Sequence, residues 1–162
     1  MKTVPRETIQ ESWDELCDFN HPQTDALVKE FLDEQPALGV YLMSLNDQLG
    51  DEAEESHVID LVLALWQATS RFKGEKLELV QPDRIEEAEA ANMHMLEELE
   101  PASEFDQMST TANLVKNYNQ MEMLGFCLEV IMQDFQDEPQ LAPERVGMEM
   151  LWLKTIMDCL DQ

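Results

Sequence analysis

One spacing in the sequence fits metal chemistry. Glu54 and His57 stand three residues apart, so on a helix both side chains lie on one face. Dinuclear carboxylate bundles take such a Glu-x-x-His pair from each of two helices, and a glutamate from each of two others. A second pair is missing, because the acids near His94 come after it, at Glu97 and Glu98. The metal-site hypothesis therefore consists of Glu54, His57, His94 and Glu98, and its simpler alternative is a polar helix start at His57.

Other catalytic signatures are absent from the sequence. It holds no G-x-S-x-G motif, no glycine-rich phosphate loop and no EF-hand loop. Cys17, Cys127 and Cys159 form no C-x-x-C pair, and each has apolar neighbours. We therefore expect three small buried side chains in a reducing compartment. The prediction is a protein that is not an enzyme and has no cofactor.

The segment from about 143 to 160 carries the strongest indication of a protein partner. Its apolar residues fill two helical stripes, although a terminal helix needs only one for its own core. The first stripe contains Val146, Met150, Leu153, Met157 and Leu160. The second has a tryptophan at its centre, and large aromatic side chains are typical of interface anchors. The predicted partner-binding residues are Met148, Leu151, Trp152, Ile156 and Cys159.

These residues need a helical scaffold, and the apolar pattern predicts one. Residues 57–72 are apolar almost all round, which indicates a buried central helix. Residues 108–135 are expected to form a long helix with a heptad seam. That seam consists of Leu114, Tyr118, Met121, Gly125, Leu128, Met132 and Phe135. Prolines and acidic residues mark further helix starts, with helices expected over about 5–19, 23–34, 36–49, 82–99 and 143–160.

The fold prediction is a single all-α domain over residues 1–162, a bundle of six or seven helices around the two helices at 57–72 and 108–135. A length of 162 residues favours one domain and allows a substantial core. Residues 76–80 alternate in polarity, but a lone strand has no partner, so we expect a packed loop there.

The charge limits the choice of partner. Ten Lys and Arg stand against 35 Asp and Glu, a net charge of −25. Such a surface repels nucleic-acid phosphates and anionic lipid, so we predict no direct nucleic-acid or membrane binding. The start of the chain has no apolar signal region and no stretch is long enough to cross a bilayer, so we expect a cytoplasmic protein.

Three functional hypotheses follow from the sequence. The first is a non-enzymatic interaction protein that forms a homodimer through its C-terminal helix. The second is an acidic adaptor, inhibitor or nucleic-acid mimic that binds a basic protein through the helix at 82–99. The third is a metal-dependent bundle enzyme built on the carboxylates and histidines above. The face expected for a basic partner contains Glu86, Glu89, Glu97 and Glu100.

One local excess of positive charge interrupts the acidic sequence. It could bind an anion or an acidic helix, but exposed pairing with neighbouring carboxylates is the favoured interpretation. The residues are Arg71, Lys73, Lys76 and Arg84.

Overall fold

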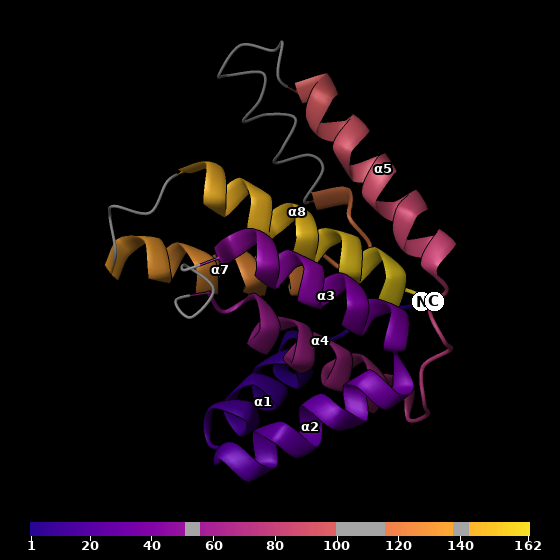
Figure 1. The fold of residues 1–162 in the computed structure, drawn as a ribbon, viewed down its shortest axis with the longest axis vertical. Helices are drawn as coiled ribbons and strands as arrows, with labels where there is room; N and C mark the ends of the chain where they lie inside the picture. The colour runs from indigo at the N-terminus through magenta and orange to yellow at the C-terminus, as the bar shows by residue number, and fades with distance from the viewer. Residues whose placement is uncertain (51–55, 100–115, 138–142) are drawn as a thin grey trace.

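The computed structural model describes residues 1–50, 56–99, 116–137 and 143–162 (Figure 1). Within these ranges the prediction of an all-α fold is confirmed, and no strand is present. Helices begin at Pro36, Pro82 and Pro143, where proline's missing N–H costs no helical hydrogen bond. The helices are α1 (Arg6–Cys17), α2 (His21–Glu34), α3 (Pro36–Leu49), α4 (Val58–Lys73), α5 (Pro82–Leu99), α7 (Met121–Asp137) and α8 (Pro143–Leu160).

Helix α4 lies in the middle of the fold, as its all-round apolar sequence predicted. It contacts α1, α2 and α8 (Figure 1). Among its large apolar residues, Ile59 and Phe72 are half-buried. The helix ends at Gly74, which adopts a left-handed φ of 71° and donates its N–H to the Ser70 carbonyl at 2.9 Å. The buried residues are Val58, Leu61, Val62, Leu63, Ala64, Leu65, Trp66, Ala68 and Thr69.

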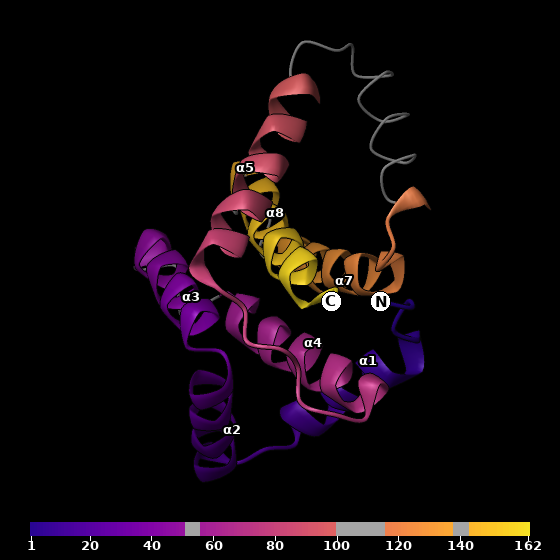
Figure 2. The same ribbon diagram turned by 90° about the vertical axis from the view of Figure 1, so that its right-hand side faces the viewer.

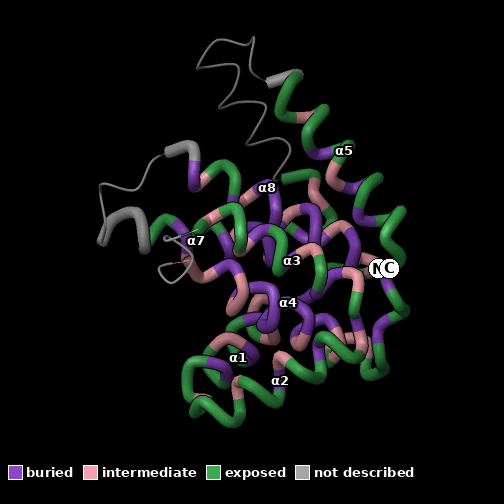
Figure 3. The backbone as a smooth tube through the Cα atoms, in the orientation of Figure 1, coloured by how far each residue is buried: buried purple, intermediate pink, exposed green. Residues whose placement is uncertain are grey.

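The second central helix is α8, and not the segment at 108–135. Helix α8 contacts α4, α5 and α7, and most of its residues are buried (Figure 3). The prediction of one long helix over 108–135 is wrong in its described part. Tyr118 is not helical, Asn119 and Gln120 form a turn, and α7 begins at Met121. Residues 108–115 lie outside the described ranges.

Three of the described residues of the predicted heptad seam face outward, while Leu114 and the side chain of Phe135 lie outside the described residues. Met121, Leu128 and Met132 are 44%, 40% and 38% exposed. A methyl group added at Gly125 would meet no other atom within 4 Å, so no neighbouring helix packs closely against this glycine. The helix has two apolar stripes, and heptad spacing alone cannot decide which one packs. The stripe that faces the core contains Met123, Leu124, Phe126, Cys127 and Ile131.

A loop between α4 and α5 is packed onto the fold, as predicted for residues 76–80. Leu77 and Val80 are buried. The fully buried side chain of Gln35 holds the loop through both ends of its amide. Its Nε2 donates to the Glu78 carbonyl at 2.9 Å, and its Oε1 accepts the Val80 N–H at 2.9 Å. A single glutamine therefore satisfies two backbone groups that no sheet partner reaches.

The cysteine prediction is right for two residues and wrong for one. All three are free thiols; Cys127 and Cys159 are buried, whereas Cys17 is exposed. Cys17 is the last residue of α1 and lines a surface cleft together with Trp13, Leu16 and Asp60, so its apolar neighbours leave it exposed. Burial raises the pKa of the Cys127 thiol to about 12.

The described helices include none with both the length and the apolar content that a bilayer crossing requires.

Candidate functional site

The residues of the metal hypothesis are not brought together in the described part of the chain. His57 precedes the first turn of α4, with its Nδ1 3.6 Å from a carboxylate oxygen of Asp60 and its ring edge-on to Trp13. His94 lies on the exposed face of α5. Glu54 and the side chain of Glu98 lie outside the described residues. Among the residues that are described, no three His, Cys, Asp or Glu side chains are grouped to hold a metal ion.

The predicted partner-binding stripe of α8 lies mostly inside the chain's own core. Trp152 is 3% exposed and Leu151 is 9% exposed, while Ile156 and Cys159 are fully buried. Met148 is the exception, with 39% of its surface exposed. Helix α8 needs both stripes because α4, α5 and α7 all pack against it. This stripe therefore presents one exposed apolar residue to a second molecule.

Two of the four basic residues, Arg71 and Lys76, form the carboxylate pairs of the favoured interpretation. Arg71 pairs with Glu15 on α1, and Lys76 pairs with Glu34 on α2. Arg84 donates to the backbone carbonyl of Asp158 at 3.1 Å. These three cations therefore connect elements of the fold.

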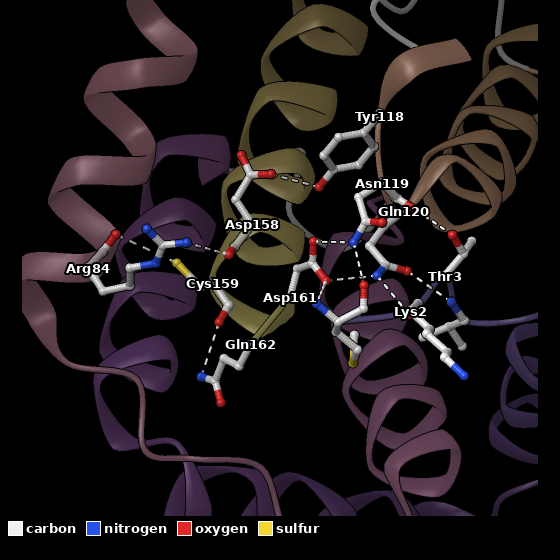
Figure 4. A network of polar contacts seen from close by, with 12 residues as sticks. Lys2, Thr3, Arg84, Tyr118, Asn119, Gln120, Asp158, Cys159, Asp161 and Gln162 are labelled. Carbon is white, nitrogen blue, oxygen red and sulfur yellow. Dashed lines mark hydrogen bonds and ion pairs between the residues drawn. The ribbon is translucent and has the colours of Figure 1, made fainter.

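A polar network joins α5, α8 and the turn before α7 (Figure 4). The Tyr118 hydroxyl donates to one carboxylate oxygen of Asp158 at 2.7 Å. The other oxygen accepts from Asn92 at 2.9 Å and from Lys154 at 2.8 Å. Burial, and then the negative charge of Asp158, raises the pKa of Tyr118 above its ordinary value. Each of these groups makes hydrogen bonds to its neighbours, so the network holds α5, α8 and the turn before α7 together.

A second set of polar contacts draws the two ends of the chain together (Figure 4). The Asp161 carboxylate accepts from the side-chain amides of Asn119 and Gln120 at 2.7 and 2.8 Å. It also lies 3.3 Å from the Met1 amino group. Gln120 Oε1 accepts the Val4 N–H at 3.0 Å. This set explains why the chain turns at 118–120: the amide side chains there connect the first and last described residues.

One surface carries exposed apolar side chains, most of them from a segment without charged residues. Val40 and Met43 on α3 are 70% and 65% exposed, and Leu32 on α2 is 37% exposed. Leu32 packs directly over Gly39, since a methyl group at Gly39 would overlap its side chain. Gly39 adjoins Val40, and Met43 follows one helical turn later. We call Leu32, Val40 and Met43 the α3 patch.

The surroundings of the α3 patch are exceptional for this chain. Residues 35–46 contain no Asp, Glu, Lys or Arg, although the whole chain is 28% charged. Helix α3 lies at an outer edge of the molecule (Figure 2). A large exposed apolar surface on a soluble protein often marks a site of interaction. The sequence analysis did not predict this patch, because the helix already has a complete apolar stripe for the core, formed by Leu38, Tyr41, Leu42, Leu45 and Leu49. The lack of charged residues on the opposite side was the signal in the sequence.

Helix α5 exposes two of the four carboxylates that the second hypothesis names. Of its predicted residues, Glu86 and Glu97 are exposed. Glu89 is half-buried and accepts a hydrogen bond from the Tyr41 hydroxyl at 2.9 Å. Glu100 lies outside the described residues. Met93, which is 45% exposed, adds an apolar contact beside the carboxylates.

Comparison of the whole chain with protein-family models, with curated proteins and with solved structures found no significant match.

Proposed function

We propose that this protein is a non-enzymatic interaction module that associates with a second copy of itself through the α3 patch. The observation that carries the proposal is the exposure of Val40 and Met43 on a helix whose residues 35–46 have no charge. The self-association expected from the sequence is kept, and its location is moved from α8 to α3.

Charge favours this particular surface for two identical chains. Each carries −25, so two copies repel each other wherever their acidic faces meet. An uncharged face lets the chains approach with the carboxylates pointing away, and burial of the exposed apolar side chains supplies the attraction. The rival surface on α7 is less suitable, since Glu122 and Glu129 adjoin its exposed residues Met121 and Leu128, whereas no charged residue lies within three positions of Val40 or Met43.

The test compares oligomeric state in two pairs of variants. Val40→Asp with Met43→Asp should convert a concentration-dependent dimer into a monomer in sedimentation velocity. Met121→Asp with Leu128→Asp is the matched control, because it adds the same charge to exposed apolar positions on α7. A wild-type chain that stays monomeric at millimolar concentration would sink the proposal, as would dissociation by the α7 pair alone.

Salt gives the proposal a second signature. An apolar dimer of like-charged chains should become tighter as salt rises, because repulsion between exposed charges is screened over about 8 Å at physiological ionic strength. Binding held by opposite charges should become weaker under the same change.

A second candidate function is binding of a basic protein, which the exposed carboxylates of α5 favour. Here Glu86→Lys with Glu97→Lys should weaken binding of a lysine-rich peptide. The pair Glu7→Lys with Glu11→Lys on α1 should weaken it less, although it changes the net charge equally. Equal effects of the two pairs would argue for diffuse attraction by the whole acidic surface.

We infer a cytoplasmic location for either function. The inference is supported by three free thiols, Cys17, Cys127 and Cys159, which reducing compartments preserve.

A further inference from the structure

Helix α5 buries few of its own side chains. Among the described side chains of residues 82–97, only Ile85, Ala88 and Asn92 are buried. Helix α4, over 16 residues, buries nine. Beyond Asn92 no described side chain of α5 is buried, and this half of the helix extends past the other helices (Figure 2). The attachment of α5 to the fold therefore depends on its N-terminal half.

This attachment is mainly polar. Arg84 donates to the Asp158 carbonyl at 3.1 Å, and Glu89 accepts from the Tyr41 hydroxyl at 2.9 Å. Asn92 makes three hydrogen bonds to side chains of α8, at 2.8–3.2 Å. Water replaces such bonds when a helix leaves, so each adds only modestly to the stability of the docked helix. Segments with few buried apolar contacts open at a lower free energy than the whole fold, and α5 is such a segment.

The loop before α5 supplies a fixed pivot. The side-chain amide of Gln35 holds this loop through the Glu78 carbonyl and the Val80 N–H. The next residue, Gln81, is exposed and directly precedes Pro82, where α5 begins. A rotation of the backbone at Gln81 therefore moves α5 and leaves the anchored loop in place.

One buried thiol lies under the docked helix. The Sγ atom of Cys159 on α8 is 3.9 Å from the backbone carbonyl oxygen of Arg84 on α5, and its side chain is fully buried (Figure 4). Cys127 is also fully buried, but it belongs to α7, which packs on α1 and α8. Departure of α5 alone should therefore expose Cys159 and leave Cys127 covered.

We propose that α5 is a hinged helix, which swings away from α3 and α8 about Gln81 while the other described helices stay packed. The closed state covers the Tyr41 hydroxyl and the Cys159 thiol, and the open state exposes both to solvent. The fold thus contains a conformational device that controls access to one face of α8. The device is independent of the α3 patch. The carboxylates of Glu86 and Glu97 are exposed in the closed state and stay exposed in the open one.

The two buried thiols allow the opening of α5 to be measured separately from unfolding of the whole chain. Cys17→Ala removes the exposed thiol, and alkylation of Cys127 and Cys159 is then followed over hours by peptide mass spectrometry. Each rate is divided by the rate of the same thiol in denaturant, which removes differences in intrinsic reactivity. Cys159 should react at least about tenfold faster than Cys127. Its rate should also rise less steeply with urea, because departure of one helix exposes less surface than global unfolding.

Two chemically identical substitutions form a matched pair. Ile85→Val removes one methylene from the docked face of α5, and Ile9→Val removes one from the buried face of α1, which packs on α4 and α7. Ile85→Val should accelerate alkylation of Cys159 about fivefold, the factor that corresponds to a typical loss of this kind. Ile9→Val should accelerate alkylation of Cys127 by about the same factor and change that of Cys159 by less than about twofold.

Equal corrected rates for the two thiols, with the same urea dependence, would overturn the proposal, because both would then report global unfolding. A fivefold acceleration of Cys159 in Ile9→Val would overturn it for the same reason. Hydrogen exchange supplies an independent check, since the backbone amides of residues 88–92 should open with the same free energy as Cys159. Fast exchange of these amides without alkylation of Cys159 would mean that α5 frays in place, and the hinge would be wrong.

Discussion

The hydroxyl of Tyr118 donates a 2.7 Å hydrogen bond to Asp158, and the ammonium of Lys154 lies 4.6 Å from the centre of the same tyrosine ring. The Tyr118 side chain thus contacts a carboxylate through its hydroxyl and an ammonium group through the face of its ring. The contact fixes the turn before α7 against α8. It also keeps the phenol protonated in the native state.

Alkaline pH should therefore unfold the protein and ionise its tyrosines in the same transition. Burial raises the pKa of both Tyr41 and Tyr118, the only two tyrosines of the chain. In the unfolded chain a phenol ionises near pH 10. Above about pH 10 the unfolded state releases protons that the native state retains, so the free energy of unfolding falls as pH rises. The near-ultraviolet absorbance of tyrosinate should stay flat until the helical signal is lost. A tyrosine that titrates at its ordinary pH in the native protein would contradict this.

Substitution of Trp152 should unfold the chain and not merely separate two copies. The side chain is 3% exposed and packs in the core, so Trp152→Asp buries an unpaired charge and leaves a cavity. The loss should exceed about 4 kcal/mol, which is exceptional for one substitution. Met148→Asp on the same helix, where 39% of the side chain is exposed, should change stability by less than about 0.5 kcal/mol. Denaturant unfolding of both variants makes the comparison.

Removal of the Gln35 side chain should lower the free energy of unfolding and loosen the loop at residues 76–80. Gln35→Ala leaves the Val80 N–H without a partner, at a cost of about 1–3 kcal/mol, while the Glu78 carbonyl keeps its hydrogen bond from Gln162 Nε2 at 3.2 Å. Hydrogen exchange at the Val80 amide should accelerate more than exchange in α4. Gln81→Ala, at an exposed position of the same loop, is the control and should alter neither quantity. Unchanged exchange at Val80 in Gln35→Ala would show that another group holds the loop.

The three thiols should react in two classes. Cys17 is exposed, whereas Cys127 and Cys159 are buried, and burial raises the pKa of Cys159 to about 11. A thiol reagent should modify one cysteine in the native protein and all three in denaturant. Cys17→Ala should abolish the native reaction. A fast reaction of either remaining thiol in that variant would mean that the core opens readily.

Much of the fold could be predicted because local signals agreed. For α4, apolar residues on every side left burial as the only possibility, and Gly74 fixed its end. The failures arose where a helix had two apolar stripes. On α7 the heptad seam pointed outward, and on α8 both stripes were used by neighbours within the chain. Sequence periodicity reports that a face is apolar, and it does not report what covers the face.

The candidate sites were harder to predict for a related reason. The α3 patch depends on Leu32 lying over Gly39, a contact between two helices that periodicity does not contain. Each residue alone fits an ordinary position on an amphipathic helix, and only the juxtaposition distinguishes it.

The covering of α4 by α8 has a consequence for biosynthesis. α8 follows every other described helix along the chain, while α1, α2 and α4 lie in its first half. Translation from Lys73 to Pro143 takes about 4–14 s at about 5–20 residues per second. During that interval the leucines of α4 that α8 later covers are exposed on the nascent chain. Chaperones that bind apolar nascent segments can bind there.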